Sequence, residues 1–338
     1  LSVSGAGTLA LSANNSYGPA AAAGFGTAIN GGATVQVGNN SALGLGDVSI
    51  PTGGTLQAGG AGLNLPNNID VASGGTATVD NNGNNLTLSG VISDGGGVTK
   101  IGNGVMTLSG NNNYFGNTTV SGGFLSLSSD ANVSSSPNII LNGGGLLGNG
   151  TFFLSASHNI GIGSALGAIG TNAFIDAASG QTFEVDGMIA SAGNTGTNIL
   201  IVNSGPGNNG TLVLNNINTF NGFTTVSNGT LQIMNSQALQ NSTLIYNSGT
   251  VAFNNIATAT LGGLTGTNSL ALTNLNGGIL SLTVINNSSM IYGGNLYDAA
   301  IGGALTKFGT GTLSLTGSNA YNGGTSANSP QATATTLT

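Results

Sequence analysis

Short runs of alternating apolar and polar residues recur along the whole chain, and they predict β-strands. Such runs include "GTLSLTG", "GFLSLSS", "GTLVLNN", "GTLQIMN", "QTFEVDG" and "GILSLTV". A period of two places successive side chains on opposite faces, as in a strand with one buried face. Gly-Gly, Asn-Gly and Asn-Asn pairs separate the runs, and such pairs mark turns. The pattern therefore predicts an all-β chain.

One segment of sequence appears four times. The clearest copies are "VTKIGNGVMTLSGNNNYFGNTT" and "LTKFGTGTLSLTGSNAYNGGT", at residues 98–119 and 305–325. Looser copies lie at residues 1–17 and 200–225. The aromatic residue after the Asn-rich turn recurs at intervals of 97, 106 and 101 residues, as Tyr17, Tyr114, Phe220 and Tyr321. Self-similarity at a nearly fixed period is typical of a protein built by stacking.

A shorter period within each long repeat predicts the architecture. Strand-like runs near Leu108, Leu125, Ile140 and Phe153 are separated by turn pairs. Coils of about 20 residues, each with two or three short strands, would stack in parallel as a β-solenoid of about 17 coils. We expect one continuous solenoid over residues 1–338, whose super-repeats are approximately 1–97, 98–199, 200–304 and a partial 305–338. A string of β-sandwiches and an amyloid-like stack are the competing all-β interpretations.

The composition suits stacked coils and excludes several functions. Gly accounts for 61 of 338 residues, charged residues for 3%, and the net charge is −7. In a stack, each outward side chain lies one strand spacing from its counterpart, where like charges repel and amides or hydroxyls do not. Lys100 and Lys307 are the chain's lysines, and Arg is absent. Binding to nucleic acid or to an anionic membrane is therefore not expected.

Other features describe the origin of the chain. It has no cysteine, so disulfides and thiolate chemistry are excluded. No apolar run is long enough for a transmembrane helix. There is no initiator Met and no signal peptide, and Leu1 falls inside a repeat. We therefore expect a mature or trimmed piece of a longer product.

The repeated segment resembles the autotransporter-associated β-strand repeat, also called the passenger-associated transport repeat. The 1–17 and 200–225 copies lack its lysine. The matching positions in the two clear copies are Lys100, Gly102, Gly104, Leu108, Gly110, Asn112, Tyr114, Gly116, Lys307, Gly309, Gly311, Leu313, Leu315, Gly317, Asn319, Tyr321 and Gly323. For the recurrent lysine, the residues leave open a salt bridge, a carbonyl contact or a role in transport.

The resemblance implies a fold and a location. Such repeats occur in secreted passengers of Gram-negative bacteria, typically right-handed parallel β-helices at the cell surface, and are associated with passage across the outer membrane. It therefore implies a right-handed parallel β-helix that is extracellular or exposed on the outer membrane. Passengers usually precede a C-terminal barrel. This sequence shows no barrel pattern, so membrane contact would come only through a translocator domain that is absent here.

Candidate catalytic and metal-binding groups are few. His158, the chain's one histidine, has Ser155 and Ser157 nearby in sequence. No nucleophile-elbow motif is present, and we expect His158 to be a loop or surface residue. A metal site with several histidines is excluded.

A carboxylate pair is the remaining candidate site. Glu184 and Asp186 alternate with Phe183 and Val185, which should face inward. With Asp176 from an adjacent corner, they form a weak candidate for Ca²⁺, although solubilising charges on a wet face are the simpler interpretation. No catalytic residue and no cofactor are expected.

These observations favour a non-enzymatic structural protein of the cell surface, a rigid stalk or adhesin-like passenger. The first alternative is a self-assembling fibre or sheath subunit that stacks head to tail. The second is a polysaccharide-degrading β-helix enzyme, which the absence of Arg disfavours. The expected partners are the chain itself, end to end or laterally, or other components of the cell surface or extracellular matrix.

Overall fold

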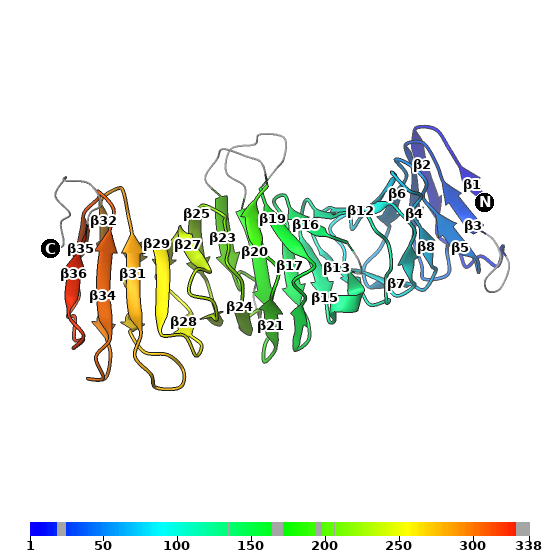
Figure 1. Cartoon of the computed structure of the whole chain (residues 1–338). Helices are drawn as coiled ribbons and strands as arrows, with labels where there is room; N and C mark the ends of the chain where they lie inside the picture. Colours follow the sequence, from blue (N-terminus) through cyan, green and yellow to red (C-terminus); the bar gives the residue numbers. More distant parts are fainter. Residues whose placement is uncertain (19–24, 134–135, 164–171, 193–197, 206, 329–338) are drawn as a thin grey trace. The chain divides into compact units, whose positions relative to one another are not determined.

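Stacked parallel strands make up nearly all of the regular structure. The computed structural model describes residues 1–18, 25–133, 136–163, 172–192, 198–205 and 207–328. The chain divides into two compact units, Leu1–Gly161 and Ile162–Thr338, and in each the chain winds through successive coils (Figure 1). The prediction of an all-β solenoid is confirmed.

The first unit contains three parallel sheets, and each coil contributes up to one strand to each sheet. The first sheet orders β1 (Ser2–Val3), β3 (Phe25–Ile29), β5 (Asp47–Ser49), β8 (Ile69–Asp70) and β11 (Ile92–Ser93). The second orders β2 (Gly7–Leu11), β4 (Ala33–Val37), β6 (Thr55–Ala58), β9 (Thr76–Asp80), β12 (Gly97–Ile101), β14 (Thr118–Val120), β16 (Asn138–Leu141) and β19 (Asn159–Ile162). The third orders β7 (Leu63–Leu65), β10 (Leu86–Leu88), β13 (Val105–Leu108), β15 (Phe124–Leu127) and β17 (Gly145–Gly148).

Most strands of the second unit belong to two parallel sheets. Its main sheet orders β20 (Asn172–Ala177), β23 (Asn198–Val202), β25 (Gly222–Val226), β27 (Leu239–Tyr246), β29 (Thr258–Gly266), β31 (Ser281–Ile285), β34 (Ala304–Phe308) and β36 (Thr325–Ala327). A second sheet orders β21 (Thr182–Val185), β24 (Thr211–Leu214), β26 (Thr230–Ile233) and β28 (Thr250–Phe253). The shorter strands are β22 (Ile189–Ser191), β30 (Leu270–Ala271), β32 (Met290–Tyr292), β33 (Leu296–Tyr297) and β35 (Leu313–Leu315).

Two small elements complete the described structure, β18 (Phe152–Leu154) and the 3₁₀ helix η1 (Asp130–Asn132). Ser129 caps η1 at its N-terminus, and its side chain accepts a hydrogen bond from the Ala131 backbone N–H. Among the described residues, no helix has the length and apolar character needed to cross a membrane.

The number of coils is smaller than the sequence predicted. The structure has about 13 turns, whereas a 20-residue coil predicted about 17. Gln57 pairs with Asp80, 23 residues later, and Phe183 pairs with Leu212, 29 residues later. The coils are longer than the predicted length of about 20 residues because the corner loops between strands vary in length, and the longer loops add residues to a coil. The predicted super-repeat boundaries and the continuity of one solenoid over 1–338 stay predictions.

The alternating pattern sorts side chains as expected, apolar inward and amides outward. In β4, Val35 and Val37 are fully buried and Gln36 is half-buried. Gln36 stacks on Gln57 of the next coil, with 2.8 Å between Nε2 and Oε1. Gln57 in turn donates to the Asp80 carboxylate at 2.8 Å. Such ladders satisfy outward polar groups without placing like charges one strand spacing apart.

Truncating a core side chain should destabilise the stack locally. Leu125 of β15 is fully buried between Met106 and Leu146 of the adjacent coils. We expect Leu125→Ala to lower the free energy of unfolding by about 2–5 kcal/mol, through lost burial and a residual cavity. Urea unfolding would measure the loss, with the outward Thr107→Ala as the control, and an equal effect of the two substitutions would contradict the assigned inward and outward faces.

Candidate functional site

The two recurrent lysines lie inside the solenoid. Lys100 of β12 and Lys307 of β34 are both fully buried. Lys100 Nζ donates to the carbonyl oxygens of Gly102 at 2.9 Å and of Gly122 in the next coil at 2.8 Å. The ammonium therefore binds backbone carbonyls at a corner where two coils meet. Of the three roles that the sequence left open, the structure shows the carbonyl contact.

In the second clear copy, backbone carbonyls bind the lysine ammonium in the same way. Lys307 Nζ donates to the carbonyl oxygens of Phe308 at 3.0 Å, Gly309 at 2.6 Å and Asn286 of the preceding coil at 3.4 Å. A buried ammonium is costly unless its donors are satisfied. Three carbonyl acceptors match its three N–H groups, which explains why each lysine sits two residues before a glycine whose carbonyl faces back.

Burial disfavours the charged form of both lysines. It lowers the pKa of Lys100 from 10.5 to about 8, and the negative charge of Asp80 partly opposes the shift. Burial likewise lowers the pKa of Lys307. Because both side chains are buried, no lysine ammonium reaches the surface of the described chain.

The motif asparagine joins successive coils in all four copies. Asn112 Oδ1 accepts from the Ile92 backbone N–H at 2.8 Å, and its Nδ2 donates to the Asn132 carbonyl, so it links three coils. Asn218 does the same between Ile189 and Ala238, at 2.8 and 3.0 Å. The two outer copies keep half of the pattern. Asn15 donates to Ala42, and Asn319 accepts from Leu296.

The motif aromatic fills the core beside this asparagine. Tyr114 is fully buried, and its hydroxyl lies 2.6 Å from Thr118 Oγ1. Burial raises the pKa of Tyr114 to about 12, and the Thr118 hydrogen bond opposes part of that rise. Phe220 is buried in the third copy but has no hydroxyl. There Thr224, which corresponds to Thr118, pairs with Ser242 of the next coil at 2.8 Å.

Motif glycines mark places where one coil passes close to the next. A Cβ on Gly110 would overlap the carbonyl oxygen of Gly90, and one on Gly317 would overlap that of Gly294. Gly102 has φ +79°, a left-handed conformation that favours glycine. Both requirements come from the tight corners of the coil.

Sequence reasoning missed two asparagines that hold the coil before each lysine. Asn81 donates through Nδ2 to the carbonyls of Asn84 at 2.9 Å and Val105 at 3.0 Å. Asn286 donates to those of Ser288 at 2.8 Å and Thr312 at 3.0 Å. Each directly follows an alternating run, "ATVD" and "LTVI", about 20 residues before the lysine's turn. That position could have identified these two asparagines from the sequence, but asparagine is so abundant in the chain that they did not stand out.

Of the three candidate Ca²⁺ carboxylates, Glu184 and Asp186 lie together and Asp176 does not join them. Phe183 and Val185 are buried and Glu184 is half-buried, as the alternation predicted. Glu184 and Asp186 both accept from Asn215 Nδ2 at 2.9 Å. The pKa of Glu184 is raised by burial first and then by the charge of Asp186.

Asp176 belongs to a different cluster. It is fully buried and accepts from Ser204 N–H at 3.0 Å, Gly205 N–H at 3.1 Å and Asn208 Nδ2 at 2.8 Å. Its oxygens therefore hold the turn that follows β23. Within the described ranges, no group of three or more His, Cys, Asp or Glu residues is arranged to hold a metal ion.

His158 lies in a loop as expected, but it is buried rather than on the surface. Its Nδ1 is 2.8 Å from the Ser136 carbonyl oxygen, and its Nε2 is 3.2 Å from Asp130 Oδ1. Ser155 and Ser157 pair with each other at 2.7 Å between their hydroxyl oxygens. The histidine thus ties η1 to the following corner, and its bonds do not form a nucleophile–base pair.

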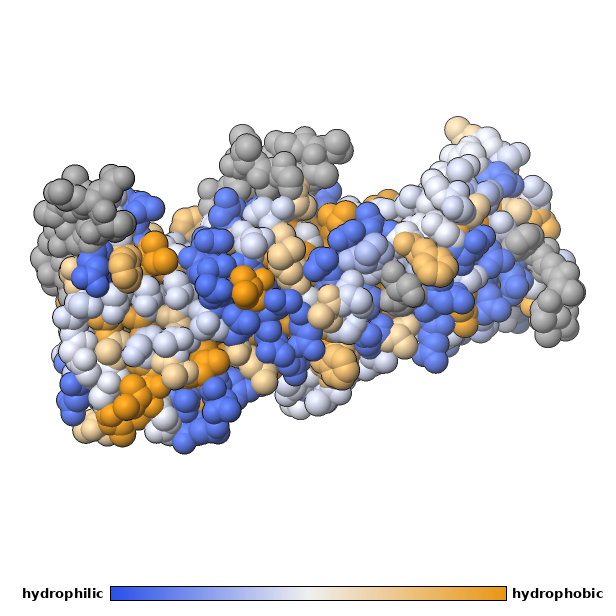
Figure 2. Space-filling model, viewed as in Figure 1, coloured by the Kyte–Doolittle hydropathy of each residue, from blue (hydrophilic) through white to orange (hydrophobic). Residues whose placement is uncertain are grey.

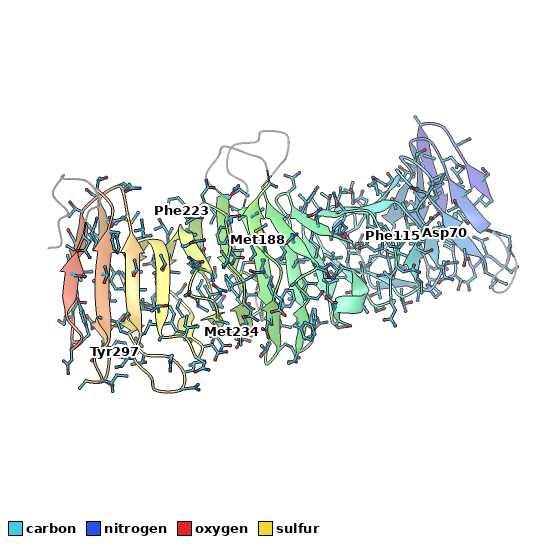
Figure 3. The ribbon with its side chains drawn as sticks, viewed as in Figure 1. Asp70, Phe115, Met188, Phe223, Met234 and Tyr297 are labelled. Carbon is cyan, nitrogen blue, oxygen red and sulfur yellow. The ribbon has the colours of Figure 1, made fainter. Side chains whose placement is uncertain are left out.

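The outer surface mixes amides, hydroxyls and scattered apolar side chains. Figure 2 shows orange apolar patches interspersed with blue and pale residues on the visible face. Phe115 is 64% exposed and Tyr297 is 44% exposed, and Figure 3 labels both, Tyr297 among the C-terminal coils. Open hollows of about 440 and 470 Å³ lie on the second unit, around Gln240 and Ile285.

Comparisons with known proteins find the same four copies. The family described as passenger-associated transport repeat matches residues 1–37, 98–127, 208–233 and 305–329. The chain is 33% identical over 239 residues to a protein named adhesin BmaC autotransporter, from Brucella suis biovar 1 (strain 1330). This chain is an autotransporter passenger-associated repeat protein. The alignment covers 68% of the chain and about 7% of the length of that relative, and no solved structure matches.

In this passenger-associated repeat protein, the residues of the family's motif therefore hold successive coils together. The lysine, the asparagine and the glycines each contact the backbone of a neighbouring coil, and the tyrosine packs between them. The motif residues therefore act on the stack itself.

Removing the Asn112 side chain, which clamps its coil to both neighbouring coils, should weaken the contacts with both. We expect Asn112→Ala to lower the free energy of unfolding by about 1–3 kcal/mol, because the Ile92 N–H is left without its acceptor. Asn113→Ala is the matched control, since that side chain is exposed. Urea unfolding and amide hydrogen exchange of β11 and η1 would measure both variants. Unchanged exchange in Asn112→Ala would contradict the clamp.

The buried Lys100 predicts a rise of stability with pH. Its pKa is about 8 in the folded chain and near 10.5 when unfolded, so the unfolded chain binds more protons between these values and the free energy of unfolding increases with pH. We expect the urea midpoint to rise between pH 8 and about 9, below the range where tyrosines ionise in the unfolded chain. Lys100→Met should show a smaller rise, and Lys307 contributes equally to both proteins. Identical pH profiles would refute the assignment.

Proposed function

We propose that this chain is a non-enzymatic, adhesin-like segment of an autotransporter passenger, displayed outside the cell or on the outer-membrane surface. The observation that carries the proposal is its 33% identity over 239 residues to an autotransporter adhesin, combined with the four passenger-associated transport repeats. Because the chain spans about 7% of that relative, we assign the adhesive role to the segment as a proposal.

The physical design supports a binding scaffold. Coil-to-coil hydrogen bonds and a continuous core hold the strands in register, so outward side chains keep fixed spacings. The buried lysines leave outward faces that carry amides, hydroxyls and a few carboxylates. Such a surface suits a partner of the cell surface or extracellular matrix recognised through hydrogen bonds and shape.

Candidate acid–base groups of the described chain are occupied by structural bonds, which favours a non-enzymatic role. Asp176 binds a turn, His158 binds a carbonyl and a carboxylate, and Glu184 shares Asn215 with Asp186. A general base needs access to a substrate proton. The Glu184–Asp186 pair remains the group to test for polysaccharide cleavage.

Adhesion can be measured directly with the purified chain. Beads coated with the folded chain should adhere to mammalian cell monolayers and to extracellular matrix films more than beads coated with the heat-unfolded chain. Equal retention of the two bead types would contradict the adhesive role. Release of reducing ends from a polysaccharide panel, lost in Glu184→Gln/Asp186→Asn, would contradict the non-enzymatic role.

A further inference from the structure

One place on the main sheet of the second unit departs from regular stacking. Leu239 of β27 pairs with Leu261 of β29, but Thr243 pairs with Gly263, so four residues of β27 advance against two of β29. The additional residues form a β-bulge at Gln240 and Asn241. Bulges re-aim side chains and are frequent beside functional sites.

A glycine lies opposite this bulge. A Cβ on Gly262 would meet the Asn241 carbonyl carbon at 2.6 Å and the Ser242 nitrogen at 2.7 Å. The position therefore requires the absence of a side chain. The outward row of the sheet is consequently interrupted between the bulge and Ile285 of β31, and the surface is hollowed there.

The hollow forms a groove that crosses several coils, which we call the amide groove. It consists of the two hollows of about 440 and 470 Å³, which share Gln240, Ile285 and Asn287. Among the other lining residues are Gln237, Asn241, Thr260, Gly262 and Phe308. Both hollows are open to solvent.

The chemistry of the lining defines the ligand. No charged residue lines the amide groove, and the adjacent Lys307 ammonium is held by backbone carbonyls. Within the described ranges, the side chains of Gln237, Asn241 and Thr260 have no hydrogen-bond partner. Amides and hydroxyls offer both donors and acceptors, and Ile285, 39% exposed, adds an apolar surface.

Other occupants fit less well. An anionic polymer would find no cation in the groove. An extended peptide binds by adding a strand at a free sheet edge, but β27, β29 and β31 are each paired on both sides. An amphipathic helix needs a broad apolar surface, and here Ile285 and Phe308 are surrounded by amides and hydroxyls.

We propose that the amide groove binds a neutral oligosaccharide. Sugar hydroxyls would bond to the free amide and threonine groups, and the apolar C–H faces of the rings would pack on Ile285 and Phe308. From β27 to β34 the groove spans three strand spacings, about 14 Å, which exceeds one sugar ring. The proposal specifies the ligand class of the adhesive role proposed above and rests on it.

Titration calorimetry with the purified chain would test this assignment. The probes are cellohexaose, maltohexaose and N-acetylchitohexaose, with hexagalacturonate as the anionic comparison. We expect saturable binding of at least one neutral probe and none of hexagalacturonate. Asn241→Ala/Ile285→Ala should weaken that binding at least about tenfold, which corresponds to roughly 1.4 kcal/mol of lost contacts.

The matched control is Asn322→Ala/Ile291→Ala, an amide and an isoleucine that are exposed elsewhere on the same unit. It should retain wild-type affinity, and unfolding curves should show that both double variants are folded. Absence of binding by every neutral probe, preference for hexagalacturonate, or undiminished binding in the groove variant would each overturn the proposal. Bead adhesion without sugar binding would contradict the sugar-binding groove but leave the adhesive role standing. Sugar binding without bead adhesion would support the groove and contradict the adhesive role.

Discussion

In-register hydrogen bonding between successive coils is the constraint on which the rest of the structure depends. It places each residue one strand spacing from its counterpart in the next coil. An apolar residue then stacks on apolar residues, as Leu125 does between Met106 and Leu146. A charged side chain repeated in each coil would lie one strand spacing from a like charge. Outward positions therefore favour neutral side chains that can hydrogen-bond to the same residue type in the next coil, as Gln36 does to Gln57. The unusual composition of the chain follows from this geometry.

Closed coils also determine what the repeated motif must do. A corner turns the backbone away from the sheets, so its carbonyls lose their ladder partners and need other donors. Lys100 and Lys307 supply them with ammonium donors. Asn112 and Asn218 each donate to a carbonyl of the next coil through Nδ2 and accept from an N–H of the preceding coil through Oδ1. Glycines stand where the next coil leaves no room for a side chain. The motif residues thus form contacts between successive coils.

Much of the fold follows from local pattern. The alternating pattern correctly predicted that Phe183 and Val185 face inward. The four copies of the repeat identified the residues that hold neighbouring coils together. The coil count was overestimated because corner length leaves no periodic signal, as the 29-residue step between Phe183 and Leu212 shows. The burial of His158 and the bulge at Gln240 depend on which coil lies alongside, so sequence neighbours gave no indication of either. The sequence could not show that Asp176 and Glu184 lie in different clusters, because the distance between them depends on an intervening turn.

The most direct test of the account is the register between adjacent coils. The chain has no cysteine, so introduced pairs report on it without interference. Gln36→Cys/Gln57→Cys should form an intramolecular disulfide under mild oxidation, because paired parallel strands bring the two Cα atoms within the roughly 4.4–6.8 Å that a disulfide spans. Gln36→Cys/Asp80→Cys, two coils apart, should not. Cross-linking of the second pair in preference to the first would contradict the parallel, in-register stack.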